Sequence, residues 1–192
     1  MHVPEIIAGE LTLRPIKDKD TAALFKLFSN DEVTRFMDIA SFSNISEAAQ
    51  IISFFQERQQ EDDGFRMAIT FTGKDELIGT CGFHKWSKVH YKAEIGYDLL
   101  PEYWGRGIMT AAITALVAFG FKEMDLNRIE AFVDPVNTLS AKLLQRIGFT
   151  QEGLLRDAFF EKGSFVDAYI YSLLKAEHAR EQFWENSYEI KK

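Results

Sequence analysis

Cysteine is nearly absent from this sequence of 192 residues. A chain with one cysteine, Cys81, can form no intramolecular disulfide and no cysteine-based zinc site. Cys81 stands between Thr80 and Gly82 on an expected strand, which favours a core position over a nucleophilic role. His84 and His90 lack metal-ligand spacing with other candidate ligands, and we interpret both as surface or hydrogen-bonded residues. We therefore expect neither a disulfide framework nor a metal.

Basic residues are in the minority, with 22 Lys and Arg against 29 Asp and Glu and a formal net charge of −7. This balance argues against a nucleic-acid surface, and it tolerates cationic substrates such as amines or basic peptides. The longest apolar run, at residues 111–121, is interrupted by Thr114 and Gly120 and is too short to span a bilayer. The first residues lack the basic and apolar regions of a signal peptide. We expect a soluble cytoplasmic protein that binds neither nucleic acid nor membrane.

The apolar pattern predicts an α/β or α+β fold. A chain of this length suits one domain with a substantial core, and one mixed sheet with helices on its faces is the simplest arrangement. Alternating runs predict strands at residues 10–16, 65–71, 76–86, 92–99, 128–134, 150–160 and 164–174. Helical periodicity and capping residues predict helices at residues 21–28, 46–60, 108–124 and 137–147, and a C-terminal helix at about 176–186.

The most informative stretch is the loop at residues 101–110, between an expected strand and an apolar helix. Gly105 and Gly107 let the backbone approach a ligand, and the first N–H groups of the helix point at it, which is typical of a phosphate or pyrophosphate site. The dinucleotide pattern needs a third glycine where Thr110 stands, and the P-loop pattern needs a Gly-Lys-Ser/Thr sequence that is also missing. A tight strand-to-helix turn without a ligand is the alternative.

Several further motifs follow in a fixed order. They are Ile95-Gly96-Tyr97, Trp104-Gly105-Arg106-Gly107, Asn137-x-x-Ser140, Ile147-Gly148-Phe149, Glu152-Gly153-Leu154-Leu155-Arg156 and Gly163-Ser164-Phe165-Val166-Asp167. From residue 10 to about residue 175 the chain resembles the GCN5-related N-acetyltransferases (GNAT), which bind acetyl-CoA through a loop written Arg/Gln-x-x-Gly-x-Gly/Ala. More narrowly, it resembles the branch that acetylates the N-termini of ribosomal proteins.

The resemblance implies one N-acetyltransferase domain over residues 1–192. Its sheet would be mixed, mostly antiparallel and twisted, with about six to seven strands flanked by helices. It also implies acetyl-CoA as the co-substrate, with no metal. The cofactor-binding residues that it implies are Leu99, Leu100, Trp104, Gly105, Arg106, Gly107, Ile108, Met109, Thr110, Asn137 and Arg146. Arg106 and Arg146 could instead be solvated charges, and Asn137 can also cap its helix.

Three positions depart from the family pattern. Trp104 replaces Arg or Gln, and Met109 replaces the last Gly or Ala of the loop. Neither change removes the backbone donors. Many members use a tyrosine as the general acid at the position where this chain has Leu144, so we expect Ser140 to protonate or hold the leaving sulfur. Ser140 as an ordinary residue of the helix start is the alternative.

The implied reaction also needs a base and a donor for the developing oxyanion. An α-amino group, with a pKa of about 8, needs only a modest base, and Glu94 is our candidate. Glu130 and Glu152 are rivals, and a structural ion pair is the alternative for each of these carboxylates. A backbone N–H near residues 98–100 is the expected oxyanion donor.

We expect the acceptor to be a primary amine, namely the N-terminal α-amino group of a protein. Acetylation of a small amine such as a polyamine or an aminoglycoside is the alternative, and a non-catalytic acyl-CoA-binding module is a third. The helix at 44–60, with Phe42, Phe54 and Phe55, would wall the acceptor cleft. The run of Glu57, Glu61, Asp62 and Asp63 could bind a polyamine, although a solvated face is favoured. The chain is also compatible with a homodimer.

Overall fold

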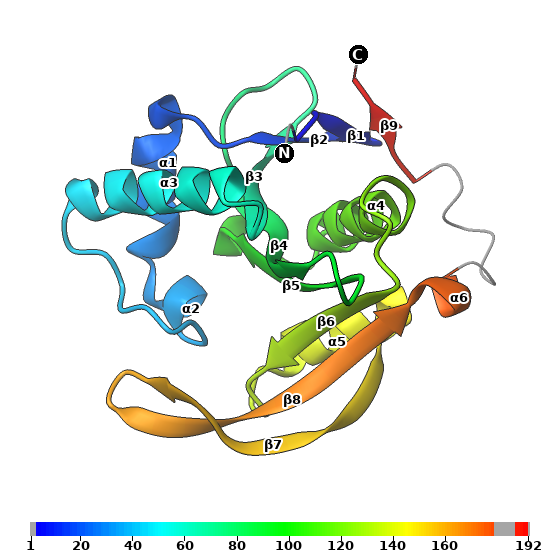
Figure 1. Ribbon diagram of the computed structural model, residues 1–192. Helices are drawn as coiled ribbons and strands as arrows, with labels where there is room; N and C mark the ends of the chain where they lie inside the picture. The colour runs from blue at the N-terminus through cyan, green and yellow to red at the C-terminus, as the bar shows by residue number, and fades with distance from the viewer. Residues whose placement is uncertain (1–2, 179–186, 192) are drawn as a thin grey trace.

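The computed structural model describes residues 3–178 and 187–191, and these residues build one sheet with helices on both faces (Figure 1). Within them the sheet has nine strands in the order β7-β8-β6-β5-β4-β3-β2-β1-β9. The elements are β1 (Ile6–Ala8), β2 (Leu11–Pro15), η1 (Asp18–Asp20), α1 (Thr21–Phe28), α2 (Asp31–Thr34), α3 (Ile45–Gln60), β3 (Gly64–Phe71), β4 (Gly79–Ser87), β5 (Lys92–Leu99), η2 (Pro101–Tyr103), α4 (Ile108–Glu123), β6 (Arg128–Val133), α5 (Thr138–Ile147), β7 (Thr150–Glu161), β8 (Ser164–Leu174), α6 (Lys175–His178) and β9 (Glu189–Ile190).

The expected mixed, mostly antiparallel sheet is confirmed, but the expected number of strands is too low. Strands β1 and β9, of three and two residues, were not predicted, because neither is long enough to show a periodic pattern. They extend the edge beyond β2, with β9 pairing against β1. The short helix α2 was also missed. The predicted C-terminal helix begins as α6 over Lys175–His178, and its remainder, at residues 179–186, lies outside the described residues.

The two faces of the sheet carry separate apolar clusters. On β3, Met67 and Ile69 belong to the cluster that contains α4 and α5, whereas Ala68 between them belongs to the cluster of α1 and α3. Side chains alternate between the faces of a strand, so one strand serves both clusters. Cys81 is buried in the α4 cluster, and this burial raises the pKa of its thiol to about 12. The interpretation of Cys81 as a core residue is therefore confirmed.

Helix α4 is apolar around most of its circumference, which is why the sequence predicts a buried helix at this position. Ten of its residues are buried, and Gly120 lies close to the side chain of Phe83 on β4. A Cβ added at Gly120 would lie 2.8 Å from Cζ of Phe83 on β4. Helix α4 is therefore held firmly, and its N-terminal end has a fixed position beside β5.

Strands β5 and β6 are neighbours in the sheet, and they are its only parallel pair among the described residues. They pair over three residues only, from Lys92 opposite Arg128 to Glu94 opposite Glu130. Beyond this point β5 continues against β4 as far as Leu99, and β6 continues against β8 as far as Val133. The two halves of the sheet therefore separate here, and the gap between them positions the candidate site.

Candidate active site

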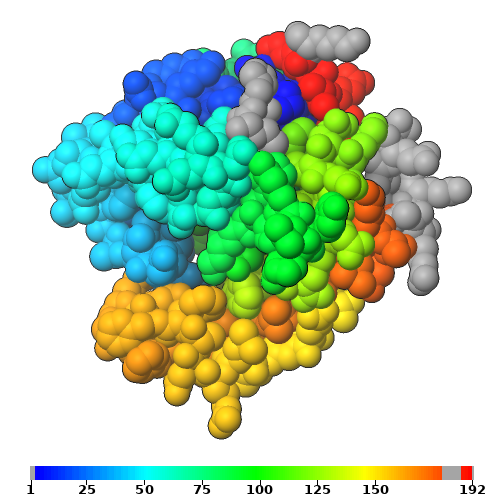
Figure 2. Space-filling model, in the orientation of Figure 1, coloured from blue at the N-terminus to red at the C-terminus, as the bar shows by residue number. Residues whose placement is uncertain are grey.

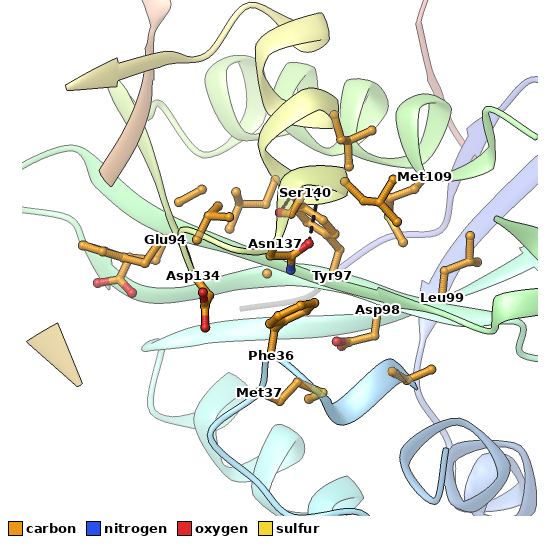
Figure 3. A pocket seen from close by; sticks show the side chains of 18 of the residues that line it. Phe36, Met37, Glu94, Tyr97, Asp98, Leu99, Met109, Asp134, Asn137 and Ser140 are labelled. Carbon is orange, nitrogen blue, oxygen red and sulfur yellow. Dashed lines mark hydrogen bonds between the residues drawn. The ribbon is translucent and has the colours of Figure 1, made fainter. Parts of the chain in front are cut away.

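A cleft of about 1010 Å³ occupies the gap between β5 and β6. Both strands and the N-terminal ends of α4 and α5 form part of its wall. The rest of the wall comes from three places: the segment that follows α2, helix α3, and the β7–β8 hairpin. Figure 2 shows the surface indented where the blue and cyan N-terminal helices meet the orange β7–β8 hairpin. In Figure 3, Met109 and Ser140 lie on one side of β5, and Phe36 and Met37 lie on the other. The cleft therefore crosses the sheet and is open to elements on both of its faces.

The hydrogen-bond pattern of β5 decides which backbone groups face this cleft. The N–H of Leu100 donates to the carbonyl of Ile78, at 3.0 Å. Hydrogen-bonded pairs alternate along an antiparallel ladder, so the even-numbered residues of β5 bond to β4. The N–H groups of Tyr97 and Leu99 therefore point to the opposite edge, beyond the last residue that pairs with β6. Two backbone donors thus face the gap.

Leu99 and Leu100 have different positions, although the sequence predicted both as cofactor-binding residues. Leu99 lines the cleft, and its carbonyl accepts a hydrogen bond from Nε1 of Trp104, at 2.8 Å. The structure does not bring Leu100 to the cleft. Its side chain is only 3% exposed and packs with α1 and α3, and its N–H is already bonded to Ile78. Of residues 98–100, where we expected the oxyanion donor, Leu99 is therefore the one whose N–H faces the gap.

The glycine loop leads directly into α4. Gly105 and Gly107 have φ angles of 73° and 78°, in the left-handed region that favours glycine. The first helical hydrogen bond runs from the N–H of Ala111 to the carbonyl of Gly107, at 3.0 Å. The N–H groups of residues 108–110 therefore have no partner within the helix, and these residues line the cleft. The predicted anion cradle thus has the required backbone geometry.

The two predicted arginine contacts have different surroundings. Arg146, on α5, lines the cleft and is exposed. Arg106 is exposed on the loop, and its guanidinium lies 5.6 Å from the ring centroid of Tyr103, outside the cleft lining. The structure therefore places the loop backbone at the cleft but turns the Arg106 side chain toward Tyr103.

Helix α5 brings Ser140 to the same gap. The Oδ1 of Asn137 accepts the N–H of Ser140 at 3.2 Å, which confirms that Asn137 caps the helix. The hydroxyl of Ser140 lies 2.7 Å from the hydroxyl of Tyr97 (Figure 3). Tyr97 was not singled out as a site residue, although it belongs to the motif at residues 95–97. Leu144 is fully buried, so its position faces the core and not the cleft.

Glu94 lies in the cleft beside one histidine and one lysine. Its carboxylate is 3.2 Å from Nε2 of His84 and 3.0 Å from Nζ of Lys85, and its side chain is 13% exposed. Burial opposes ionisation, but the hydrogen bonds from His84 and Lys85 outweigh it and lower the pKa of Glu94. His84 also lines the cleft, beside Gly96, whose added Cβ would lie 3.2 Å from Cε1 of His84. The sequence did not predict that His84 lines the cleft. Its position beside Glu94 is set by the register of β4 against β5, which the sequence does not reveal.

The rival carboxylates lie outside the cleft lining. Glu130 pairs with Arg128 at 2.7 Å and with Lys92 at 2.9 Å, as the structural interpretation expected. Glu152 pairs with Arg128 at 2.6 Å, and its hydrogen bonds with Arg128 and Ser172 lower its pKa to about 2. Among the three candidates, only Glu94 reaches the cleft.

The α3 side of the cleft is partly aromatic, as expected. Phe54 and Phe55 line it, whereas Phe42 packs in the core with its ring centroid 5.5 Å from that of Phe28. Phe42 was therefore wrongly predicted as a wall residue. The predicted carboxylate run is also outside the cleft lining, which none of its members joins: Glu57, Glu61, Asp62 and Asp63. In that run, Asp62 pairs with Lys88 and Asp63 with Arg58.

Six carboxylates besides Glu94 line the cleft, and three of them come from separate segments of the chain. Asp38 follows α2, Asp134 follows β6, and Glu161 ends β7. Burial and the charges of Asp38 and Asp134 raise the pKa of Glu161. Within the described residues, neither Asp38 nor Glu161 takes part in an ion pair with a basic side chain. The three carboxylates are thus close enough to interact through their charges, and the positive charge of Lys162 opposes their effect on the pKa of Glu161.

No group of three or more His, Cys, Asp or Glu side chains in the described part of the chain could hold a metal ion. Over the same residues, the helices are too short or too polar to cross a membrane.

The family follows from comparison with known proteins. The model of the acetyltransferase (GNAT) domain matches residues 10–150. This chain belongs to the GNAT family. It is 43% identical to "Uncharacterized N-acetyltransferase p20" of Bacillus licheniformis, over 88% of this chain and 95% of that protein. Family membership makes the chain an acetyl-CoA-dependent N-acetyltransferase, and the residues quoted from the sequence identified that family correctly.

The names of two other GNAT relatives mention an acceptor. "Putative ribosomal N-acetyltransferase YdaF" of Bacillus subtilis is 32% identical, over 87% of this chain and 92% of that protein. Spermidine N(1)-acetyltransferase of Escherichia coli is 27% identical, over 84% of each chain. Among solved structures, the microcin C7 self-immunity acetyltransferase MccE in complex with acetyl-CoA and AMP has a TM-score of 0.78 and 26% identity, over 86% of this chain and 93% of that one. Acetyl-CoA is thus bound by a protein of this fold.

Proposed function

We propose that this GNAT protein transfers the acetyl group of acetyl-CoA to the α-amino group at the N-terminus of a protein, such as a ribosomal protein. The observation that carries the proposal is the cleft that crosses the sheet between β5 and β6. The phosphate-type loop lies at one of its faces, and carboxylates line the other. The relative named as a ribosomal N-acetyltransferase supports this acceptor class.

The side of the cleft that would bind acetyl-CoA has hydrogen-bond donors and a positive charge that suit this ligand. The unpaired N–H groups at residues 108–110 would hold the pyrophosphate, since the positive end of a helix favours anions. Arg146 would contact a phosphate farther along α5. The N–H groups of Tyr97 and Leu99 would bond to the extended arm and to the carbonyl oxygen. When bound, acetyl-CoA supplies an acetyl group that is activated as a thioester.

The acceptor side must provide a neutral amine. An α-amino group has a pKa of about 8, so roughly a tenth of it is neutral at pH 7 before any catalysis. The neutral fraction has already released its ammonium proton to solvent, and Glu94 would accept the proton that the nitrogen loses as it bonds to the acetyl carbon, directly or through one water molecule. Its lowered pKa keeps it ionised at neutral pH, although this also makes it a weak base. Such a base is adequate for an α-amine and poor for a lysine, whose pKa is about 10.4.

The reaction forms one bond and breaks one. The amine nitrogen bonds to the acetyl carbon, the carbon–sulfur bond breaks, and the sulfur keeps the electron pair. Leu99 would donate its N–H to the oxyanion that develops on the carbonyl oxygen. The Ser140 hydroxyl would donate a hydrogen bond to the departing sulfur. The amine proton passes to Glu94.

A polyamine is the second candidate acceptor, and three carboxylates that line the cleft favour it. Asp38, Asp134 and Glu161 could together hold the second ammonium group of such a molecule. The spermidine acetyltransferase relative is in line with this alternative. The same carboxylates would also suit a protein N-terminus that is followed by basic residues.

Coenzyme A release measured with three acceptors separates these proposals. They are a lysine-containing peptide with a free N-terminus, the same peptide with a blocked N-terminus, and spermidine. We expect release with the free peptide and little with the blocked one. Release with spermidine alone would overturn the protein acceptor, and release with the blocked peptide would point to lysine. No acceptor-dependent release from this set would contradict the proposed reaction.

A further inference from the structure

Tyr97 and Ser140 meet where β5 and β6 have already separated, with their hydroxyl oxygens 2.7 Å apart. We propose that Tyr97 is a positioning residue, which donates to the Oγ of Ser140 and thereby directs the Ser140 proton at the leaving sulfur. This inference rests on the proposed acetyl transfer. It adds a residue from β5 to a task that we first assigned to α5 alone.

The direction of the hydrogen bond follows from the acidity of the two hydroxyls. A phenol is a much stronger acid than an aliphatic alcohol, so the Tyr97 hydroxyl donates and the Ser140 oxygen accepts. Burial raises the pKa of Tyr97, although its bond with Ser140 opposes the rise, and the phenol therefore keeps its proton. The hydrogen of Ser140 is then left to bond with another acceptor.

The backbone around Ser140 limits where this hydrogen can go. The N–H of Ser140 is held by Oδ1 of Asn137, at 3.2 Å, so the residue is fixed in the first turn of α5. Ser140 and Tyr97 both line the cleft, and the Tyr97 N–H faces the same gap. Because the Ser140 oxygen accepts the Tyr97 hydrogen bond, the Ser140 hydrogen is oriented away from Tyr97 and is pre-organised to donate into this gap.

The start of α5 also favours the charge that forms there. The positive end of a helix stabilises a nearby anion, and Ser140 is the third residue of the helix. As the carbon–sulfur bond breaks, the sulfur keeps the electron pair and accepts a hydrogen bond from Ser140. The thiolate then takes a proton from water after it leaves. Tyr97 keeps its proton throughout this step. Its raised pKa is consistent with this role, because a phenol with a high pKa stays protonated at neutral pH.

The test is a double-mutant cycle with Y97F, S140A and the double variant. We expect Y97F to lower kcat about tenfold, which is the loss of one well-placed hydrogen bond, with the KM for acetyl-CoA changed less than about twofold. S140A should lower kcat by about a hundredfold. The double variant should be no slower than S140A, because Tyr97 acts only through Ser140.

Tyr171 provides the matched control. It is buried, its hydroxyl donates to Oε1 of Gln151 at 2.8 Å, and it lies outside the cleft lining. Y171F therefore removes a similar hydrogen bond and should retain the kcat of the unmodified protein. The melting temperatures of all four variants show whether a loss of stability accounts for any fall in kcat.

Two outcomes would overturn the positioning role. One is a Y97F variant with unchanged kcat, and the other is a double variant that is slower than S140A by the full Y97F factor. A protein that acetylates no amine would instead contradict the proposed function, and the two failures are therefore distinguishable.

Discussion

The indole Nε1–H of Trp104 donates to the carbonyl oxygen of Leu99, at 2.8 Å. This bond joins the first residue of the Trp104-Gly105-Arg106-Gly107 motif to the last residue of β5. Leu99 also presents its N–H to the gap between the strands, so one peptide segment connects the pyrophosphate loop with the proposed oxyanion donor. The family position that usually holds Arg or Gln thus has a structural role in this chain.

Replacing Trp104 by phenylalanine removes this hydrogen bond and keeps an aromatic ring. One such bond contributes about 1 kcal/mol, so we expect the KM for acetyl-CoA to rise about fivefold. The kcat should change less, because the reacting groups are elsewhere. The measurement is steady-state kinetics at saturating acceptor, with W86F as the control, since Trp86 lies outside the cleft lining. Equal KM values for W104F and the wild-type protein would show that the Trp104 hydrogen bond does not contribute to acetyl-CoA binding.

Gly107 has a φ of 78° at the start of α4, and alanine adopts this conformation only with strain. We expect G107A to lose about 1–2 kcal/mol of stability and to weaken acetyl-CoA binding at least tenfold, because the methyl group enters the ligand space. Gly73, in the β3–β4 turn, has a φ of 80° and equally open surroundings. G73A should therefore lose similar stability with normal affinity. Calorimetric titration with acetyl-CoA would contradict this view of the cradle if both variants bound alike.

Sequence patterns predicted the helices and strands that have enough residues to show a period. Helix α4 and the glycine loop were predicted because apolar length and glycine spacing are local signals. Strands β1 and β9 were not, since they have only three and two residues, and β9 depends on pairing with β1 near the other end of the chain. Leu99 and Leu100 are neighbours in sequence, yet only the pairing of β5 with β4 shows which one faces the cleft.

The site residues that the sequence missed depend on contacts between separate segments. Tyr97 meets Ser140 across 43 positions of sequence, and His84 meets Glu94 across two strands. The spacing of residues along the chain cannot predict either contact. Phe42 was misplaced for the opposite reason. An aromatic residue near a helix start suits a cleft wall and a core equally well, and here the core includes it.

Glu94 is the proposed base, and E94Q tests it while keeping the size of the side chain. We expect kcat with a peptide acceptor to fall by about tenfold or more, because the amine proton loses its acceptor. E152Q is the control, since Glu152 is a paired carboxylate outside the cleft lining. Unchanged turnover of E94Q would exclude Glu94 as the base. An equal loss in E152Q would indicate a general effect of removing one negative charge.

The pH dependence of the rate distinguishes the acceptor amine from the base. The hydrogen bonds from His84 and Lys85 lower the pKa of Glu94 despite its burial, so Glu94 is already ionised throughout the range above pH 5. The rise of kcat/KM with pH should therefore follow the amine, and level off near pH 8 for an α-amino group. A peptide profile that still rises above about pH 9 would indicate a lysine as the acceptor.

The position of the transferred acetyl group tests the central claim most directly. A peptide with a free N-terminus and an internal lysine is incubated with the protein and acetyl-CoA, and the acetylated atom is located by tandem mass spectrometry. Our account predicts that the acetyl group is on the α-nitrogen of the first residue. An acetyl group on the lysine, or an unmodified peptide under conditions in which spermidine is acetylated, would contradict it.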